Sequence, residues 1–335
     1  MSYEKLPKVE LHLHLDCSLS YEVVKQLDPS MTIARYRESF IAPAKCTDLA
    51  DYIKRAIKGF ELMQTKEQLR MVTLDLFKQL AAENVLYAEI RFAPLQHTME
   101  GLAPVDVVSI VNDATVECIR SYGIEAGIIL CTLRHYTAAQ SLETVELVQH
   151  FKGSKVVGFD IAADEAGFPI DNHIGAFKYA HENGISCTAH AGEAKGAESV
   201  WEILDNFYPA RIGHGVRSIE DPQLLSSLKK RNIHLEVCPT SNIQVNVFDK
   251  IEDHPADIIF NEGISMSINT DARTISNTTL AKEYMLMEKT FNWTRHHFMK
   301  CNLEAIAHAF TSPEIKQNIR EKIIGAYTTQ PTRPI

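Results

Sequence analysis

Two histidines that lie two residues apart, His12 and His14 in the stretch VELHLHLD, are the first residues whose types suit chemistry. Side chains alternate faces along a strand, so both would point to the same side, roughly 6–7 Å apart along the chain. An isolated His-x-His more often marks two partly exposed histidines on one strand face. The pair therefore predicts a metal site only if other ligand-type residues converge on it.

Further residues of suitable types occur in short motifs later in the chain. His190 lies in TAHAGE with Glu193 three residues beyond it, His214 lies in RIGHGV, and Asp271 ends SINTD. Each of these residues, taken alone, has an alternative interpretation as an ordinary buried polar group. Their meaning depends on whether the fold brings them to one place.

Short apolar, β-branched segments separated by amphipathic helical patterns predict how the chain folds. Alternation of strands and helices predicts parallel strands joined by right-handed crossovers. We expect a (β/α)8 TIM barrel rather than an open doubly wound sheet, because no G-x-G-x-x-G follows the first strand. The expected strands are 9–15, 85–94, 124–133, 156–162, 185–190, 211–216, 234–239 and 264–271.

Extra helices are expected after the first strand and at the C-terminus of a single domain covering 1–335. One predicted helix starts with a capping box at Thr65 and Gln68, and another runs from Pro104 to Gly123. The long insertion over 17–84 would form part of a lid over the C-terminal side of the barrel. Its helical segment 49–63 either packs on the core or covers a substrate.

The composition of the chain limits the classes of partner that it is expected to bind. The 335 residues carry a formal net charge of −9 without a Lys/Arg-rich run, which argues against nucleic acid or an anionic membrane. No run of 18 apolar residues and no signal-peptide core are present. Seven cysteines without a C-x-x-C pair do not suit a disulfide framework, so a cytoplasmic location is expected.

The chemistry of a TIM barrel sits at the C-terminal ends of its strands, where the candidate residues fall. We assign His12, His14, His190 and Asp271 as ligands of a metal with one position left for water. Imidazoles with one carboxylate favour zinc, although iron or cobalt could occupy similar ligands. The fourth strand carries no bridging lysine, and Lys155 lies at its opposite end, so one Zn²⁺ per chain is expected.

Two of the candidates remain to act on a substrate. A bound metal lowers the pKa of its water to about 7 in favourable sites, which supplies hydroxide near neutral pH. Glu193 is placed to exchange a proton with the reacting group. His214 is placed to orient the hydroxide or to stabilise charge on it.

The chain resembles the adenosine deaminase family within the amidohydrolase superfamily, a set of zinc-dependent (β/α)8 barrels. The resemblance covers nearly the whole chain and rests on the motifs PKVELHLHLD, GFDIAADE, TAHAGE, RIGHGV, EVCPTSN and SINTD. The order of HAGE, GHGV and NTD is far more specific than the His-x-His alone.

The resemblance implies zinc-dependent deamination of adenosine or 2′-deoxyadenosine to inosine or 2′-deoxyinosine and ammonia, by attack of a metal-bound hydroxide on purine C6. It implies the same four metal ligands. Glu193 would protonate purine N1, His214 would position the hydroxide, and Asp271 would also accept a proton from the water. Asp16 would contact the ribose 5′-hydroxyl, and the backbone N–H of Ala163 would meet purine N3. The implied partner is a small purine nucleoside, with no other cofactor.

Three positions depart from the familiar family pattern. Cys17 and Ala163 stand where glycine is usual, and Ala272 replaces a second aspartate that bonds purine N7. Loss of such a hydrogen bond costs about 0.5–1.5 kcal/mol, more if N7 is left buried and unpaired. Possible substitutes for the missing aspartate are Arg273, Thr274 and Asn277.

Ala272 keeps other functions open. One is deamination of a different 6-amino compound, such as adenine or aminodeoxyfutalosine, although Asp16 counts modestly against free adenine. Another is a catalytically silent purine-binding protein on the same barrel. A metal-dependent hydrolase of esters or amides is disfavoured by the missing second-metal lysine. Protein partners cannot be derived from the residues.

The other polar residues near these motifs have plainer interpretations. Asp164 and Glu165 follow the fourth strand and either support the site or form a solvated pair. Several further histidines are expected to be surface or structural residues, namely His97, His135, His173 and His181.

Overall fold

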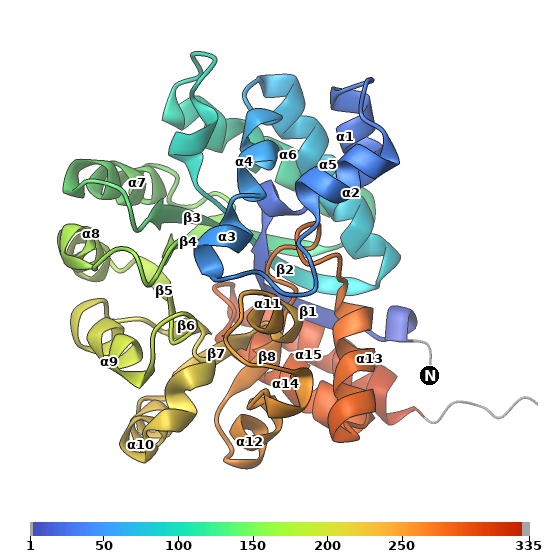
Figure 1. Ribbon diagram of the computed structural model, residues 1–335, viewed down its shortest axis with the longest axis vertical. Coiled ribbons are helices and arrows are strands. Elements are labelled where there is room, and N and C mark those ends of the chain that lie inside the picture. The colour runs from blue at the N-terminus through green and yellow to red at the C-terminus, as the bar shows by residue number, and fades with distance from the viewer. Residues whose placement is uncertain (1–2, 330–335) are drawn as a thin grey trace, which may run out of the picture.

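A computed structural model describes residues 3–329, within which eight parallel strands follow one another around a barrel in sequence order (Figure 1). Surrounding helices complete the expected (β/α)8 architecture. The single-domain interpretation of 1–335 stays a prediction, since its ends lie outside the described residues. The strands are β1 (Lys8–His14), β2 (Val85–Phe92), β3 (Glu125–Leu133), β4 (Val156–Ala162), β5 (Ser186–Ala191), β6 (Arg211–His214), β7 (His234–Val237) and β8 (Met266–Ile268).

The barrel closes between β8 and β1 through hydrogen bonds that join β1 to residues 269–271, which we call the seam. β8 is short, and the side chain of Asn269 takes over its pairing by accepting a hydrogen bond from Leu11 N at 2.9 Å. Beyond it, His14 N donates to the carbonyl of Asp271 at 2.8 Å, and Asp271 N donates to the carbonyl of His12 at 3.0 Å. The seam therefore fixes Asp271 beside the end of β1.

Helices surround the strands and fill the connection between β1 and β2. They are α1 (Tyr21–Leu27), α2 (Ile33–Phe40), α3 (Leu49–Ile53), α4 (Ala56–Glu61), α5 (Lys66–Ala82), α6 (Pro104–Tyr122), α7 (Ala138–His150), α8 (Ile174–Glu182), α9 (Ala197–Asn206), α10 (Pro222–Arg231), α11 (Pro239–Gln244), α12 (Ala256–Asn261), α13 (Leu280–Phe291), α14 (Arg295–His308) and α15 (Pro313–Thr328). Short 3-10 turns, η1 (Tyr3–Lys5), η2 (Leu15–Cys17), η3 (Pro94–His97), η4 (Asp171–His173), η5 (Val216–Glu220) and η6 (Ile251–Asp253), join them.

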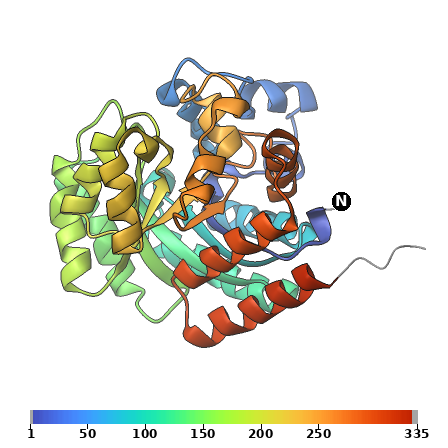
Figure 2. The same ribbon diagram turned by 90° about the horizontal axis from the view of Figure 1, so that it is seen from below.

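The expected extra helices are present at both places. Helices α1 to α5 lie in the insertion after β1, and α14 packs against β8 and β1 while α15 packs on α14 (Figure 2). The capping box at Thr65 and Gln68 begins α5. Gly123, with a φ of 68°, ends α6 in the left-handed conformation that suits a glycine. No helix within 3–329 is long and apolar enough to cross a bilayer.

Strand ends are where the observed fold differs from the expectation. The sixth strand was expected to reach residue 216, but the chain turns at its end because His214 and Gly215 have φ values of 61° and 65°. The eighth strand was expected over 264–271 and covers only Met266–Ile268. Asp271 also has a positive φ, 60°, which a carboxylate side chain tolerates better than most. These turns aim the side chains inward over the barrel mouth.

Candidate metal centre and active site

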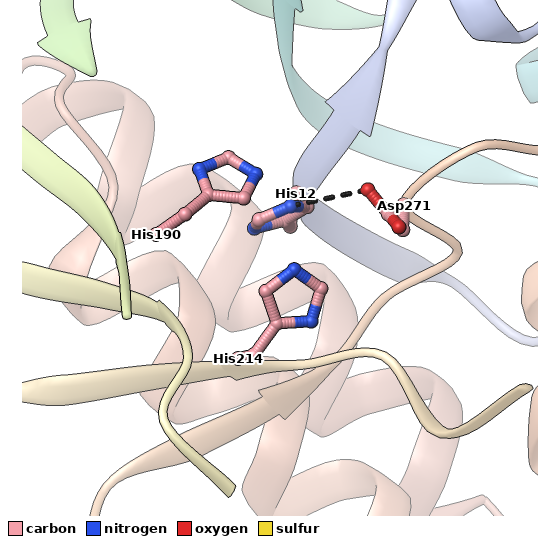
Figure 3. A group of neighbouring side chains, drawn as sticks. All are labelled: His12, His190, His214 and Asp271. Atoms are coloured by element: carbon pink, nitrogen blue, oxygen red, sulfur yellow. Dashed lines mark ion pairs between the residues drawn. The ribbon is translucent and has the colours of Figure 1, made fainter. Parts of the chain in front are cut away.

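Ligand-type side chains from four places in the barrel converge at its C-terminal end. His12 comes from β1, His190 from β5, His214 from the end of β6, and Asp271 from the loop after β8 (Figure 3). One ligand-type atom from each of the four lies within 4.8 Å of the others. The fold thus brings together residues that are separated by up to 259 positions in the sequence.

His14 reaches the same space from the end of β1. Its Nε2 lies 3.2 Å from His190 Nε2 and 3.3 Å from Asp271 Oδ1. Five side chains therefore surround a centre that needs four for a tetrahedral metal. The choice between His14 and His214 as the fourth ligand has to come from the hydrogen bonds of each ring.

Two of the histidines are oriented by buried carboxylates. His12 Nδ1 lies 2.7 Å from Glu236 Oε2, and His190 Nδ1 lies 3.1 Å from Asp160 Oδ2. His12 Nε2 is buried with no hydrogen-bond partner among the described residues and faces the cluster. A metal-binding histidine typically directs its other ring nitrogen to such a carboxylate, so the donor set fits a divalent metal.

Asp271 completes the donor set as an anion. Its Oδ2 accepts a hydrogen bond from Ser241 Oγ at 2.7 Å, and its Oδ1 lies 3.3 Å from His12 Nε2. Burial would raise its pKa, but His12 and His14 beside it hold the pKa of this carboxyl well below its usual range. Burial lowers the pKa of His14 to about 3, so its ring is neutral and can donate a lone pair.

Glu193 is a buried carboxyl next to the cluster. Its Oε1 accepts a hydrogen bond from Asn242 Nδ2 at 2.8 Å and lies 3.3 Å from His214 Nδ1. Burial, with the negative charges of Asp271 and Glu165, raises the pKa of Glu193 well above its usual range. Burial and the neighbouring histidines hold the pKa of His214 well below its usual range. These surroundings therefore favour the protonated form of Glu193 and the neutral form of His214.

The loop that carries Glu193 is held by Glu165. The Glu165 carboxylate accepts hydrogen bonds from the backbone N–H groups of Gly192 at 2.8 Å, Glu193 at 3.1 Å and Lys195 at 3.0 Å. It also accepts one from Ser199 Oγ at 2.5 Å. Glu165 is thus a support of the site and not part of a solvated pair, whereas Asp164 lies on the wall of the cavity.

A cavity of about 480 Å³ opens over this cluster. Helices α3 and α4 line it with Tyr52, Ile53 and Phe60, and Ala272 and Ile275, which belong to the same apolar cluster as these side chains, continue this wall. The expected lid segment 49–63 therefore both packs on an apolar cluster and lines the cavity. The side chains that line the cavity include several carboxylates but no lysine or arginine among the described residues.

Asp16 and Ala163 lie on the cavity wall, as a substrate-binding role would require. Asp16 is buried, yet from residues 3–329 its Oδ1 accepts only a long contact from Cys17 Sγ at 3.6 Å, and its Oδ2 lies 3.8 Å from His97 Nε2. Ala163 has a φ of 79°, where an alanine is strained and the glycine of the family pattern is not.

The residues considered as substitutes for the missing aspartate at 272 do not lie on the cavity wall. Arg273 is buried in an ion pair with Glu10 and Glu83. Thr274 Oγ1 donates to the carbonyl of Leu19 at 2.6 Å, and the side chain of Asn277 is exposed. The wall at Ala272 is therefore apolar.

Several contributors were missed in the sequence. Asn242, Glu236 and Asp160 each bond directly to a candidate residue, but a single polar residue in a strand or turn gives no spacing signal. Two of the four histidines expected to be structural or exposed bear on the site. His135 lines the cavity and His97 lies beside Asp16, whereas His173 bonds to the backbone of Arg134 and is structural.

Comparison with known proteins agrees with this arrangement. A family model described as adenosine deaminase matches residues 7–326. An adenosine deaminase of Enterococcus faecalis is 34% identical over 329 residues, covering 96% of this chain and 97% of the relative.

Two solved structures share the fold. The adenine deaminase of Arthrobacter aurescens is 25% identical, with a TM-score of 0.88 over 96% of this chain and 98% of that one. An amidohydrolase of Burkholderia ambifaria crystallised with bound Zn is 22% identical, with a TM-score of 0.89 over 97% of this chain and 91% of that one. With its barrel, its cluster of histidines and its match over nearly the whole length, the chain belongs to the adenosine deaminase family of hydrolases.

Proposed function

We propose that this protein deaminates adenosine and 2′-deoxyadenosine by hydrolysis, with the base held in the cavity over the metal donor set. The observation that carries this proposal is the buried Glu193 carboxyl on the wall of that cavity, with its Oε1 3.3 Å from Nδ1 of His214. Burial raises the pKa of this carboxyl well above its usual range, which favours its protonated form. An acid that stays protonated near neutral pH is what a neutral ring nitrogen needs in order to take up a proton during attack at the adjacent carbon.

We propose His12, His14, His190 and Asp271 as the ligands of one zinc ion per chain. Three imidazole nitrogens and a carboxylate are a donor set that zinc accepts, and the related amidohydrolase crystallised with Zn supports that choice. The metal would supply an ionised water and a Lewis acid at the site. The cytoplasm is the compartment we propose, because all seven cysteines are free thiols.

The residues around the base would divide the remaining work. Glu193 would give its proton to purine N1 as water oxygen adds to C6, and the C6 amino group would leave as ammonia. His214 would hold the attacking oxygen by a hydrogen bond, and Asp271 would accept a proton from it. Asp271 would return this proton to the departing amino group, and Glu193 would regain a proton from the C6 hydroxyl as the C6 carbonyl forms. The backbone N–H of Ala163 would hold purine N3.

The polarity of the cavity favours a nucleoside over a nucleotide. A phosphate would enter a cavity whose lining, within residues 3–329, includes Asp16, Glu61 and Asp164 but no lysine or arginine. Asp16 has almost no hydrogen-bond donor of its own, so a sugar hydroxyl would satisfy it. We propose that this group is the 5′-hydroxyl.

Free adenine is the second candidate substrate. The adenine deaminase from Arthrobacter aurescens has the same fold, and Ala272 departs from the family pattern for recognition of the base. A free base would leave the buried Asp16 carboxylate without a donor, which costs about 1–3 kcal/mol or more for a charged group.

The test is a panel of adenosine, 2′-deoxyadenosine, 5′-deoxyadenosine, adenine and AMP, compared by kcat/KM on protein with its bound metal quantified. We expect the two 5′-hydroxyl nucleosides to be the best substrates. A higher kcat/KM for adenine or AMP would overturn the choice of substrate. Glu193→Gln should lose roughly 10²–10⁴-fold in kcat and keep its metal, whereas the exposed Glu198→Gln serves as the matched control.

A further inference from the structure

A chain of buried hydrogen bonds runs from the start of α12 to the two groups that flank the metal donor set. It begins at the backbone N–H of Ala256, which lies 3.2 Å from Nδ1 of His254. A backbone N–H can only donate, so Nδ1 of His254 accepts and the ring proton is on Nε2. His254 is buried, and burial lowers its pKa to about 3, in keeping with a neutral ring.

The next link fixes the orientation of an amide. Nε2 of His254 lies 3.2 Å from Oδ1 of Asn242 and, as the protonated nitrogen, donates to it. The amide oxygen of Asn242 therefore faces His254, and its NH2 group faces the opposite way. Asn242 is fully buried between these partners, which leaves its side chain little freedom to turn over.

The NH2 group of Asn242 has one partner for each of its hydrogens. Nδ2 donates to Oε1 of Glu193 at 2.8 Å and faces Nδ1 of His214 at 3.1 Å. If Nδ1 of His214 carried a hydrogen, two donors would point at each other, so Nδ1 accepts. A neutral His214 then has its hydrogen on Nε2, the nitrogen that faces His12 and Asp271 in Figure 3.

The same link places the proton of the acid. Oε1 of Glu193 is occupied as an acceptor of the Asn242 hydrogen bond. Oε2 has no hydrogen-bond partner among residues 3–329, so a proton on this carboxyl group would be on Oε2.

We propose that Asn242 and His254 are positioning residues that set the tautomer of His214 and the proton-bearing oxygen of Glu193. This inference rests on the proposed function and extends it. His254 would act without touching a substrate, because the direction of each hydrogen bond in the chain is set by the backbone N–H of Ala256. The tautomer of His214 also decides whether His14 or His214 is the fourth metal ligand. A ring with hydrogen on Nε2 has no lone pair there to bind a metal, so His14 is the fourth ligand and His214 is a donor to the reacting oxygen.

Asn242→Asp tests the tautomer with almost no change of shape. One carboxylate oxygen can still accept from His254, but the other can only accept, so Nδ1 of His214 has to carry the hydrogen. Imidazole ¹⁵N NMR of the zinc-loaded protein distinguishes protonated from bare ring nitrogens, and His214→Asn identifies the His214 signals by their loss. We expect Nε2–H in the wild type and Nδ1–H in Asn242→Asp, each with one zinc per chain.

Kinetics supply the second readout. His254→Phe removes the donor to Asn242, and His254→Gln restores one. We expect kcat to fall by roughly 10–100-fold in Asn242→Asp and His254→Phe, with KM nearly unchanged, and to recover in His254→Gln.

Nδ1–H on His214 in the wild type would overturn the proposal, as would Asn242→Asp with both wild-type kcat and Nε2–H. The wild-type spectrum, with its signals assigned by His214→Asn, decides the tautomer even where Asn242→Asp or His254→Phe fails to fold. Because it needs no turnover, the tautomer can be read even if adenosine proves not to be the substrate.

Discussion

Glu283 on α13 makes the stability of this protein depend on pH. The side chain is fully buried, with Oε2 accepting from Thr240 N at 3.2 Å and Oε1 accepting from Thr278 Oγ1 at 2.6 Å. Burial raises its pKa from 4.5 to about 7 against these hydrogen bonds. Thr240 directly precedes Ser241 and Asn242, so this contact supports the segment that holds the site.

The direction of this pH dependence follows from which state, folded or unfolded, binds the proton. Between pH 4.5 and about 7 the folded state holds this proton and the unfolded state has lost it, so stability falls as pH rises through that window. At about 1.4 kcal/mol for each tenfold change in proton affinity, the full cost is about 3 kcal/mol. Most of this cost accrues between pH 5 and pH 8.

Glu283→Gln should remove this dependence. Glutamine can accept from Thr240 N through its oxygen and donate to Thr278 Oγ1 through its amide, because that hydroxyl can turn toward the carbonyl of Thr279 at 3.5 Å. We expect the free energy of unfolding of the variant, relative to wild type, to rise by about 2–3 kcal/mol when urea unfolding is measured at pH 8 instead of pH 5. The exposed Glu38→Gln is the control. Parallel stability profiles for wild type and Glu283→Gln would refute the reasoning.

Three further predictions follow from the contacts around the site. In Gly59→Ala the added Cβ would overlap the backbone carbonyl of Asp16, so α4 or the turn at Asp16 must move. KM for adenosine should therefore rise on the order of 10-fold or more in steady-state assays. An unchanged KM would contradict this. Glu236→Gln leaves Arg91 and Arg211 without the buried carboxylate that they share, and should lower the free energy of unfolding in urea by about 3–5 kcal/mol. A loss below about 1 kcal/mol would show that these ion pairs are not needed for stability. Removal of the metal by a chelator should lower the free energy of unfolding by about 4 kcal/mol relative to protein at 1,000 Kd of zinc, and thermal melts that do not recover when zinc is returned would count against the donor set.

The strands and the candidate ligands were readable because they repeat simple spacings. The alternation in VELHLHLD places His12 and His14 on one face, and short apolar runs mark the strands whose ends carry His190 and His214. Local capping signals such as Thr65 with Gln68 also correspond to an observed helix start. These features depend on neighbours within a few residues, which the sequence displays directly.

The supporting contacts were not readable, because they form only when the barrel closes. Glu236 and Asp160 sit in strands β7 and β4, and their contacts with His12 and His190 join residues far apart in the chain. The strand ends at His214 and Asp271 depend on positive φ values that no local signal marked. The role of Asn242 depends on hydrogen-bond partners from three different segments, which the sequence around Asn242 does not show.

We propose above that one metal is held by His12, His14, His190 and Asp271, next to the Glu193 carboxyl. Anomalous diffraction at the zinc edge, from crystals of the zinc-loaded protein, tests it most directly. We expect one peak per chain, about 2.0–2.2 Å from Nε2 of the three histidines and from a carboxylate oxygen of Asp271. Nε2 of His214 should lie outside bonding distance. A second metal, no metal at this position, or His214 bound in place of His14 would overturn this ligand assignment.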